Sequence, residues 1–401
     1  MEPKRLAARQ LELDRQHTAR YPALLARKQA RMSVSPLAFL RGAAPLFYEL
    51  LAADAELAAG PEGTGFIQGD AHLENFGAFS PAVHDASGWK KGHATFQLND
   101  FDEATRGAWR WDVLRLTTSL LLAGRELGQS GPQVLSLCEL LLKSHAAAAC
   151  TEVPLPVAPR AVAELVARVD ARSQKKLLDD RTQAIGHQRH FVRGDRYTDV
   201  PDEIVRAVPE ALALFVERTA ATGGPRLEQL EVLDVAFRIA GTGSLGSFRI
   251  AVLTRGKGGD DGSWLFDLKE QPGSSVDVLQ PRPPSASRAV EVEAAFRACL
   301  DQPPRMLGTS RIAGYDVLVR RLTPQEDKLS LARLKAEELG PLAAYLGALL
   351  GTAHRRGRSG TFPAWSARDL GGILERAVAL AGVHEAVYLE LCRLGRGDVT
   401  G

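Results

Sequence analysis

The chain has 401 residues, with 50 basic against 48 acidic side chains and a formal net charge of +2. This near balance gives no reason to expect a nucleic-acid or membrane partner, and no apolar run reaches the roughly 18 residues that a membrane span needs. The four cysteines are scattered and show no zinc-type spacing, which is typical of a reducing compartment. We therefore expect a cytoplasmic protein, long enough for two or three lobes.

The first half of the chain reads as helices around one loop-rich segment. Residues 1–60 are predicted to be helical, with Ser35 and Pro36 as N-cap and first residue of a helix. Residues 63–104 alternate glycines with short apolar runs, which indicates short strands joined by functional loops. Residues 109–149 are strongly helical. Residues 160–225 are mostly helical, with an interruption near 186–201.

The second half changes to a β-rich texture. Runs typical of strands lie at 231–240, 247–255, 263–271 and 315–322, separated by glycine-rich turns and by one helix at 287–300. From residue 330 to the end the pattern is helical again. The order of these elements predicts an α+β fold.

A first group of polar residues lies in the loop-rich segment. The sequence GDAHLENFG (69–77) holds Asp70, His72 and Asn75, and about 25 residues later Asp100 and Asp102 follow an apolar strand. Phosphoryl transfer needs a carboxylate beside the acceptor hydroxyl and oxygen ligands that hold magnesium on the phosphates. Asp70, Asn75 and Asp100 are one such set, and Asp102 is an alternative metal ligand in place of Asp100.

Each of these residues also has a plain structural interpretation. An Asp or Asn in a glycine-flanked loop is usually a turn former, so the prediction depends on the combination. His72 invites a metal site with Asp70 or His84, but no tetrahedral His/Cys spacing is present, and we interpret it as a loop-organising hydrogen-bonding residue. Asp112 opens the helix at 109–149, where a cap is the preferred interpretation.

A second group lies in the β-rich half. Gly241, Gly243 and Gly246 fit the pattern GxGxxG, with Ser244 between them. Dinucleotide-binding folds share this pattern but place it at the start of a helix. Here it separates two strand-like runs, which favours a glycine-rich hairpin over ATP phosphates.

Lys269 on the next strand is predicted to reach the nucleotide phosphates. A glutamate from the helix at 287–300 would hold it, either Glu291 or Glu293, with Glu291 favoured. The alternatives are a solvated strand lysine and an ordinary surface glutamate.

These motifs carry a family resemblance. GDAHLENFG, LNDFDEA and WDVLRL resemble the catalytic and metal-binding loops of aminoglycoside phosphotransferases and related small-molecule kinases. With RKQARMSVSPLAFLRG, GTGSLGSFR, FDLKE, RAVEVEAAF, YDVLVRRL and GTAHRRG in order, nearly the whole chain resembles the DUF2252 family of uncharacterised bacterial proteins.

The resemblance implies a protein-kinase-like two-lobe fold in circularly permuted order, with the catalytic-loop segment before the nucleotide lobe and a helix-rich large lobe. The helix at 342–357 would lie beneath the loop that begins at Gly69. The implied parts are an N-terminal helical region (1–60), a part with the catalytic and metal loops (61–150), a mostly helical substrate-side insertion (151–225), a β-rich nucleotide-binding lobe (226–328) and C-terminal helices that complete the large lobe (329–401).

The implied function is Mg-ATP-dependent phosphotransfer to a hydroxyl of a small-molecule acceptor, with Asp70 as base and with ATP and Mg²⁺ as cofactors. Transfer of AMP by a kinase fold and a non-catalytic ATP-binding scaffold are the alternatives. Two departures stand out: Gln68 precedes the Gly-Asp pair, and Asp100 is followed by Phe-Asp instead of Phe-Gly. The minimal machinery leaves out Arg41, Arg189, His190 and Arg193, which either bind an anion or form ion pairs on the surface.

Overall fold

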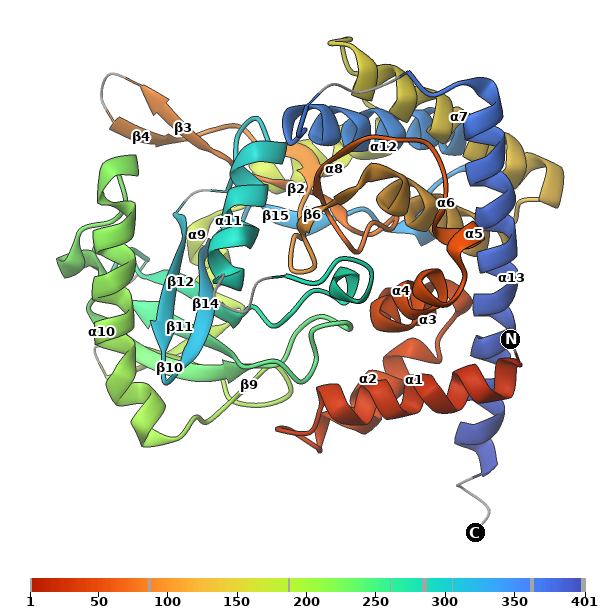
Figure 1. Cartoon of the computed structure of the whole chain (residues 1–401). Helices are drawn as coiled ribbons and strands as arrows, with labels where there is room; N and C mark the ends of the chain where they lie inside the picture. The colour runs from red at the N-terminus through yellow and green to blue at the C-terminus, as the bar shows by residue number, and fades with distance from the viewer. Residues whose placement is uncertain are drawn as a thin grey trace.

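We describe a computed structural model of the chain, which covers residues 2–85, 88–186, 188–259, 261–282, 287–304, 306–360 and 364–397. It mixes helices with mostly antiparallel sheets, and the α+β prediction is confirmed. In Figure 1 a β-rich part, drawn in greens and light blue, lies beside a larger helical part. Nowhere in these ranges is a helix both long enough and apolar enough to cross a bilayer.

The helices gather at both ends of the chain and in its middle. The N-terminal group comprises α1 (Pro3–His17), α2 (Leu24–Met32), α3 (Pro36–Gly42), α4 (Ala44–Ala53) and α5 (Ala55–Ala58). The middle holds α6 (Trp109–Glu126), α7 (Gly131–Cys150), α8 (Arg160–Asp170), α9 (Gln174–Asp179), α10 (Asp202–Thr219) and α11 (Arg288–Cys299). The chain ends with α12 (Ala336–Arg356) and α13 (Ala367–Gly397).

The main sheet has six strands in the order β13-β14-β12-β11-β10-β9. Its strands are β9 (Tyr197–Thr198), β10 (Val232–Arg238), β11 (Arg249–Thr254), β12 (Trp264–Glu270), β13 (Leu307–Ile312) and β14 (Tyr315–Leu322). Small sheets pair β1 (Thr64–Ile67) with β6 (Thr105–Ala108), β3 (Ala82–Asp85) with β4 (Gly88–Lys91), and β7 (Thr182–Ile185) with β8 (Gln188–Phe191). A three-stranded sheet joins β15 (Glu326–Lys328), β2 (Phe76–Phe79) and β5 (Thr95–Leu98).

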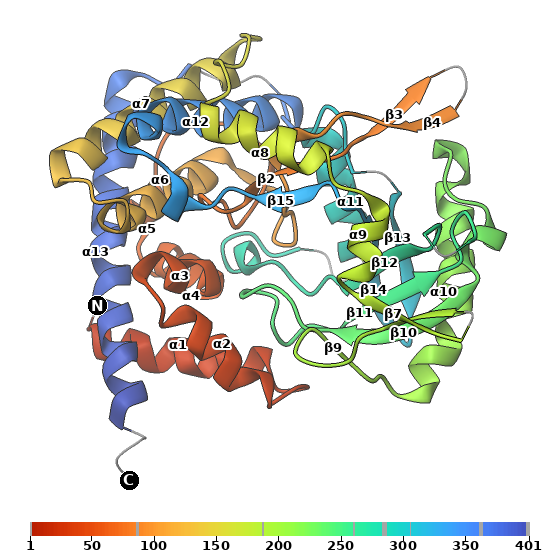
Figure 2. The same cartoon turned by 180° about the vertical axis from the view of Figure 1, so that it is seen from behind.

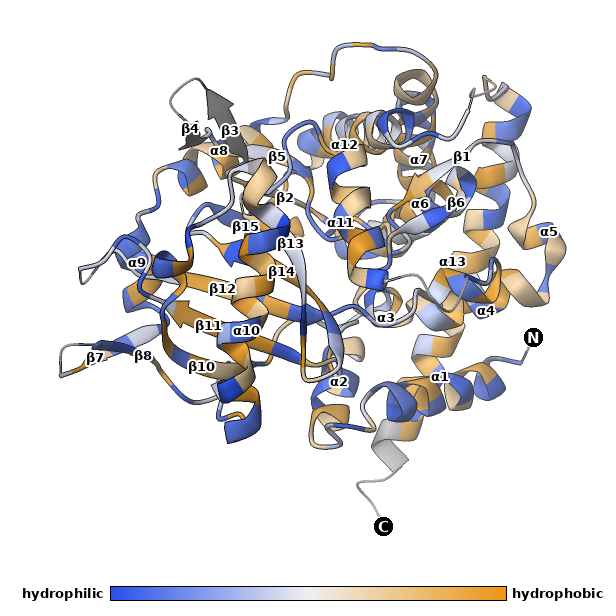
Figure 3. Ribbon diagram, turned by 60° about the vertical axis from the view of Figure 1, so that its left-hand side comes forward, coloured by the Kyte–Doolittle hydropathy of each residue, from blue (hydrophilic) through white to orange (hydrophobic). Residues whose placement is uncertain are grey.

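The two faces of the main sheet differ because successive residues of a strand point to opposite sides. Ile250, Val252 and Phe266 belong to the core under α10, and Figure 3 shows this helix crossing the apolar strands. Asp267 and Lys269 alternate with these apolar residues on β12, so they belong to the opposite face. That face is turned toward the helical part and carries the polar groups described below.

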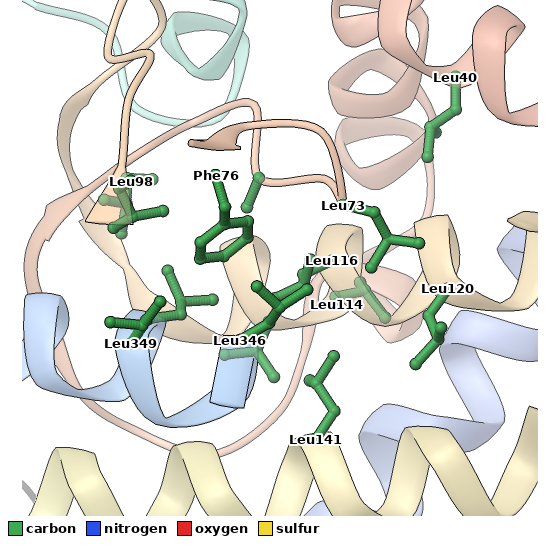
Figure 4. Packing of buried hydrophobic residues seen from close by; sticks show 14 of the residues in the cluster. Leu40, Leu73, Phe76, Leu98, Leu114, Leu116, Leu120, Leu141, Leu346 and Leu349 are labelled. Carbon is green, nitrogen blue, oxygen red and sulfur yellow. The ribbon is translucent and has the colours of Figure 1, made fainter. Parts of the chain in front are cut away.

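The helical part has its own apolar core. Leu73, from the loop before β2, and Phe76, the first residue of β2, share one buried cluster with Leu116 of α6 and Leu346 of α12. Figure 4 shows these side chains meeting between α6, α12 and the β2 segment. Burial of these two large apolar groups therefore anchors the loop at 69–77 on both sides of Glu74 and Asn75.

The segment just after helix α12 is hydrogen-bonded to strand β1. Phe66 N donates to Gly357 O at 2.9 Å, and Ser359 N donates to Thr64 O at 2.9 Å. The segment at 64–67 leads into the loop that begins at Gly69 only two residues later. Residues more than 280 positions apart in the chain thus lie side by side at the base of this loop.

Some elements were not predicted from the sequence. Strand β13 and the hairpin β7–β8 are short, with polar residues and no long apolar run, and were not predicted. The parts proposed from the family resemblance stay a prediction. In Figure 2, β15 lies beside β2 between the main sheet and the helices, so one strand from residues 326–328 completes a sheet formed by residues 76–98.

Candidate functional site

A cavity of about 360 Å³ lies where the helical part meets the main sheet. It is lined by residues from six separate segments of the sequence: the N-terminal helices, the loop after β1, the loop after β5, the glycine-rich segment, strand β12 with the loop after it, and strand β15. The predicted site residues on its wall are Asp70, Asn75, Asp100, Asp102, Gly241, Gly243, Ser244 and Lys269. The fold thus brings the two polar groups of the sequence to one cavity.

The loop that carries Asp70 is held from below by Asp112 of α6. The carboxylate of Asp112 accepts hydrogen bonds from Gln68 N (2.6 Å) and Gly69 N (2.8 Å), and its Oδ2 also lies 3.1 Å from Nε2 of His354. All of these partners are buried. The interpretation of Asp112 as a helix cap was wrong: α6 begins after Ala108 without a side-chain cap, and Asp112 fixes the loop.

One carboxylate oxygen of Asp70 is hydrogen-bonded to Arg115, and the other lies near His72. Arg115 donates to its Oδ1 from Nε (2.8 Å) and Nη2 (2.5 Å), while its Oδ2 lies 3.7 Å from Nε2 of His72. Burial raises the pKa of Asp70 to about 6, although Arg115 opposes this rise. A carboxyl with such a pKa can accept and release a proton near neutral pH.

His72 organises the loop, as predicted. Its Nδ1 accepts a hydrogen bond from Glu74 N at 3.2 Å, which places the ring proton on Nε2, toward Asp70. Burial lowers the pKa of His72, so the ring is neutral. The side chain of His84 lies outside the described residues, and no group of three His, Cys, Asp or Glu suited to a metal occurs elsewhere in the described ranges.

Asn75 and Asp100 are tied together through Gln68. The Nε2 of Gln68 donates to Asp100 O (2.6 Å) and to Asn75 O (3.4 Å), and Asn99 N also donates to Asn75 O (3.1 Å). Asn75 Nδ2 donates to Asp70 O at 2.8 Å, which leaves its side-chain oxygen for another partner. Gln68, first noticed only as a departure from a motif, is a buried brace between the two loops.

Asp100 and Lys269 face each other across the cavity. Burial raises the pKa of Asp100, but the positive charges of Lys269, Lys328, Arg249 and Arg320 together hold it below its usual range. Burial lowers the pKa of Lys269 to about 8, and Asp100 opposes this fall. Lys269 is not a solvated strand lysine, since only 9% of its side chain is exposed.

The predicted partner of Lys269 was wrong. Its Nζ is bonded to Asp102, whose other oxygen accepts from Gln271 Nε2 at 3.3 Å. Glu291 instead binds Thr105 Oγ1 at 2.6 Å, Arg282 at 2.7 Å and Arg288 at 3.0 Å. The two nearby arginines satisfy the glutamate, and the alternative Glu293 pairs with Arg297 on its own helix.

Helix α11 still contacts the loop that carries Asp100. Arg288 Nη2 donates to Asp102 O at 2.7 Å, and its Nη1 is bonded to Ala104 O. Helix α11 is therefore linked to the site by Arg288, which donates to backbone carbonyl groups of this loop.

The glycine-rich segment lies between antiparallel strands β10 and β11, as predicted. Gly241 has φ +80° and Gly246 has φ +114°, conformations that disfavour other residues. Gly246 passes so close to α1 that an added Cβ would meet His17 O at 2.5 Å.

Helix α2 reaches the same segment from the other side. Lys28 Nζ donates to Gly243 O at 3.2 Å, and Arg31 is bonded to Gly241 O. Lys28 is also paired with buried Asp14 at 3.5 Å. The N-terminal helices therefore hold the glycine-rich segment in place, a role that no sequence signal indicated.

The additional cationic residues singled out from the sequence are ion-paired. Arg41 is bonded to Glu74, Arg189 to Asp179 at 2.9 Å and Asp261 at 3.3 Å, and Arg193 to Asp199 at 2.7 Å and Asp234 at 2.9 Å. His190 lies 3.9 Å from Asp234. The structural interpretation of these residues is the one that the contacts support.

Two further site residues were missed. Arg115 stood in the motif WDVLRL, where its charge among the apolar residues Val113, Leu114 and Leu116 was the available signal. Lys328 lines the cavity from β15, and its Nζ has neither a hydrogen bond nor an ion pair within the part of the chain that the structure describes. Burial lowers its pKa, while Asp100 opposes this effect.

Comparison with known protein families gives one match. A model of uncharacterised proteins conserved in bacteria, DUF2252, matches residues 20–392. The chain belongs to the DUF2252 family. No curated protein and no solved structure matches it. The family assignment confirms the resemblance found in the motifs, while function has to be argued from the site.

Proposed function

We propose that this DUF2252 protein is a Mg-ATP-dependent phosphotransferase that acts on a hydroxyl group of a small-molecule acceptor. One observation carries the proposal: Asp70, Asn75, Asp100 and Lys269, from segments up to 199 positions apart, line one cavity beneath a glycine-rich hairpin. Carboxylate, amide oxygen, buried ammonium and backbone N–H groups are the set that phosphoryl transfer uses.

The residues present fit a magnesium ion. Mg²⁺ takes hard oxygen ligands and is usually held by one or two protein groups together with phosphates and water. Asp100 and the side-chain oxygen of Asn75 offer such ligands, whereas Asp102 already binds Lys269 and Gln271. This occupancy favours Asp100 over Asp102 as the metal ligand. Bound there, the ion would neutralise phosphate charge.

The protein groups divide the remaining work. Arg115 fixes Oδ1 of Asp70, so Oδ2 is the atom that can orient an acceptor hydroxyl and take its proton. Lys269 supplies a positive charge for the phosphates once it is drawn from Asp102. The N–H groups of the glycine-rich segment add donors for phosphate oxygens.

The arrangement also supports our proposal of a permuted kinase-like fold. The order of β10, the glycine-rich segment, β11 and β12 with Lys269, followed by α11, is the order of a kinase nucleotide lobe. The end of α12 is hydrogen-bonded to β1, which leads into the loop at 69–77. In a kinase chain that is not permuted, this helix would be followed directly by that loop. The fold proposal rests on this joint.

The test uses two substitutions with different expected effects. Asp70→Asn is expected to lower turnover of Mg-ATP by about 10²–10⁴-fold, because a positioned base contributes that much, while ATP still stabilises the protein against heat. Asp100→Asn is expected to remove the magnesium-dependent part of that stabilisation. Asp316→Asn is the control, because Asp316 lies on β14 outside the cavity lining and pairs with Arg311 of β13. Unchanged turnover in both site variants would refute the proposal.

AMP transfer and non-catalytic binding remain distinct alternatives. ATP labelled at the α- or the γ-phosphate shows which group reaches an acceptor. A protein that ATP stabilises equally with and without magnesium, and that turns over no ATP, is a scaffold.

A further inference from the structure

A second cavity, of about 320 Å³, adjoins the first and lies between the main sheet and the β15-β2-β5 sheet. The two cavities share Asp100, Lys269 and Lys328. On its sheet side the wall is made by residues of β10, β11, β12 and β14. We call this space the arginine chamber, after Arg181, Arg238, Arg249 and Arg320 on its wall.

The chamber is a poor place for a nucleotide base. Pockets for flat ring systems are lined mainly by apolar groups with a few polar ones. Here Asp267, two residues before Lys269 and on the same face of β12, lies between two guanidinium groups. Arg249 donates to it at 2.8 and 2.5 Å, and Arg238 lies 2.8 Å away. Burial opposes its charge, but these arginines hold the pKa of Asp267 below its usual range.

Several cations of the chamber have spare hydrogen-bonding capacity. Arg238 Nε is buried without a hydrogen-bond partner in the described ranges. Arg181 reaches only the hydroxyl of Tyr197, at 3.5 Å, and Lys328 has no ion pair there either. Arg320 forms an ion pair with one carboxylate, that of Glu326, at 3.2 Å. Arg238 Nε is buried, whereas Arg181 and Arg320 are half-buried and Lys328 is exposed. Cations with spare donors of this kind can bind an anionic acceptor.

The six cations on the wall of the chamber face five carboxylates, and a clearer excess of positive charge lies just outside it. An open pocket of about 640 Å³ shares Arg181 and Arg238 with it, and its lining holds two aspartates against these six arginines: Arg27, Arg31, Arg181, Arg193, Arg196 and Arg238. Burial, and then the positive charges of Arg27 and Arg41, lowers the pKa of Arg31. Cations that repel one another here are stabilised by a bound anion.

We propose that the arginine chamber binds an oligophosphate group. The inference rests on one part of the proposed function, the binding of ATP in this cleft, and not on which phosphate is transferred. The phosphate chain then lies beneath the main sheet. Planar guanidinium groups bind phosphate through two hydrogen bonds each. The oligophosphate comes either from the nucleotide itself or from a phosphorylated acceptor.

The nucleotide source has a chemical consequence. With the β- and γ-phosphates in the chamber, the α-phosphate lies next to Asp100. The acceptor oxygen then forms a bond to the α-phosphorus, the bond to the bridging oxygen breaks, and diphosphate leaves into the chamber. The hydroxyl proton passes to Asp70. This is AMP transfer instead of phosphoryl transfer.

Inorganic tripolyphosphate tests the chamber without any assumption about the acceptor. The full-length protein is titrated calorimetrically at fixed magnesium and salt, and compared with Arg181→Gln and Arg320→Gln. Each variant is expected to bind tripolyphosphate about tenfold more weakly, as expected for the loss of a charge-assisted contact. Arg311→Gln is the control, because Arg311 is 66% exposed and pairs only with Asp316 in the described structure. Two separate variants keep the test valid if one fails to fold.

The outcomes separate the two sources and the two proposals. Competition between tripolyphosphate and ATP identifies the nucleotide as the source, and binding of tripolyphosphate to the ATP-saturated protein identifies a phosphorylated acceptor. Tripolyphosphate binding that is absent, or that both site variants leave at the wild-type affinity, would overturn the inference even if Mg-ATP turnover persists. Arginine-dependent binding in a protein that neither binds nor turns over ATP would keep the chamber and remove the phosphotransferase.

Discussion

Among single residues, Asp112 contributes most directly to the shape of the site without lining its cavity. It accepts two buried backbone hydrogen bonds from the residues just before Asp70 and contacts His354. His354 in turn lies 2.9 Å from Nε2 of His145 and stacks on Trp109 with ring centroids 5.3 Å apart. A buried chain of polar groups thus connects α7, α12 and α6 to the loop.

Asp112→Ala is expected to lower the free energy of unfolding by about 3 kcal/mol, because it leaves two buried N–H groups without acceptors. Urea unfolding measures this loss. Asp54→Ala is the matched control, since Asp54 also accepts two backbone hydrogen bonds, from Glu56 N and Leu57 N, but at a helix start in a less buried place. There the cost is expected to be about 1 kcal/mol. Equal losses would mean that the buried loop does not depend on Asp112.

Gly246 is constrained both by its backbone conformation and by its close approach to α1. Gly246→Ala is expected to weaken binding of ATP and to lower stability, because its φ of +114° is strained for alanine and the new Cβ meets His17 O at 2.5 Å. Gly258→Ala separates the two causes: φ is +77° there, but no atom lies within 4 Å of the new Cβ. Thermal unfolding with and without ATP should show a larger effect for Gly246→Ala, and equal effects would exclude the contact with α1.

At the level of elements, the N-terminal helices act on the glycine-rich segment through a buried ion pair. Asp14 and Lys28 expose only 2% and 4% of their side chains, and Lys28 also donates to Gly243 O. Burial raises the pKa of Asp14 and lowers that of Lys28, and in both cases their mutual attraction opposes the shift. The pair therefore depends on both members being present.

Lys28→Met is expected to lower the free energy of unfolding by about 3–5 kcal/mol, because it leaves the charge of Asp14 buried alone. The double variant Asp14→Leu/Lys28→Met is expected to recover most of that loss, since an apolar pair can replace a buried ion pair. Urea unfolding of both variants measures the coupling. A double variant less stable than Lys28→Met would contradict this account.

At the level of the whole molecule, buried histidines set the response to acid. Burial lowers the pKa of His384 to about 4 and that of His17 to about 3, whereas an unfolded histidine has a pKa of about 6.5. The unfolded chain therefore takes up protons first. The contribution of these two histidines to the stability of the folded protein is complete above about pH 6.5. It declines as the pH falls below that value, down to about pH 4 for His384.

Asp70 acts in the opposite direction. Its pKa is raised to about 6, so its ionisation opposes folding above that pH, and stability recovers as the pH falls through 6. As the pH falls, this gain in stability partly offsets the loss caused by one of the histidines.

His384→Asn isolates one of these contributions. Between pH 7 and pH 5 the wild-type protein is expected to lose up to about 2 kcal/mol more stability than the variant, because only the wild type has a histidine at this position that gains a proton on unfolding. Asparagine keeps a donor for the carbonyl of Leu380, which His384 contacts at 2.8 Å. Urea unfolding at several pH values tests the difference in slope, and parallel curves would refute it.

The sequence by itself determined the classes of element and the residues most suited to phosphate chemistry. Alternation of apolar residues predicts the strands around Lys269, and helical periodicity predicts α6, α7 and α12, because burial of one face is a local pattern. The positions of Asp70, Asn75 and Asp100 followed from motifs of adjacent residues. Strand β13 and the hairpin β7–β8 lacked such a pattern and were missed.

Only the tertiary structure decided which side chains meet. Lys269 binds Asp102 and Glu291 binds arginines, since pairing in a buried site depends on distances of a few ångströms that spacing in the sequence does not encode. The same holds for Arg115, Lys328 and the N-terminal helices, which join the site from afar. The arginine chamber is the clearest case, because its guanidinium groups come from different strands and loops and only the folded sheet collects them on one face.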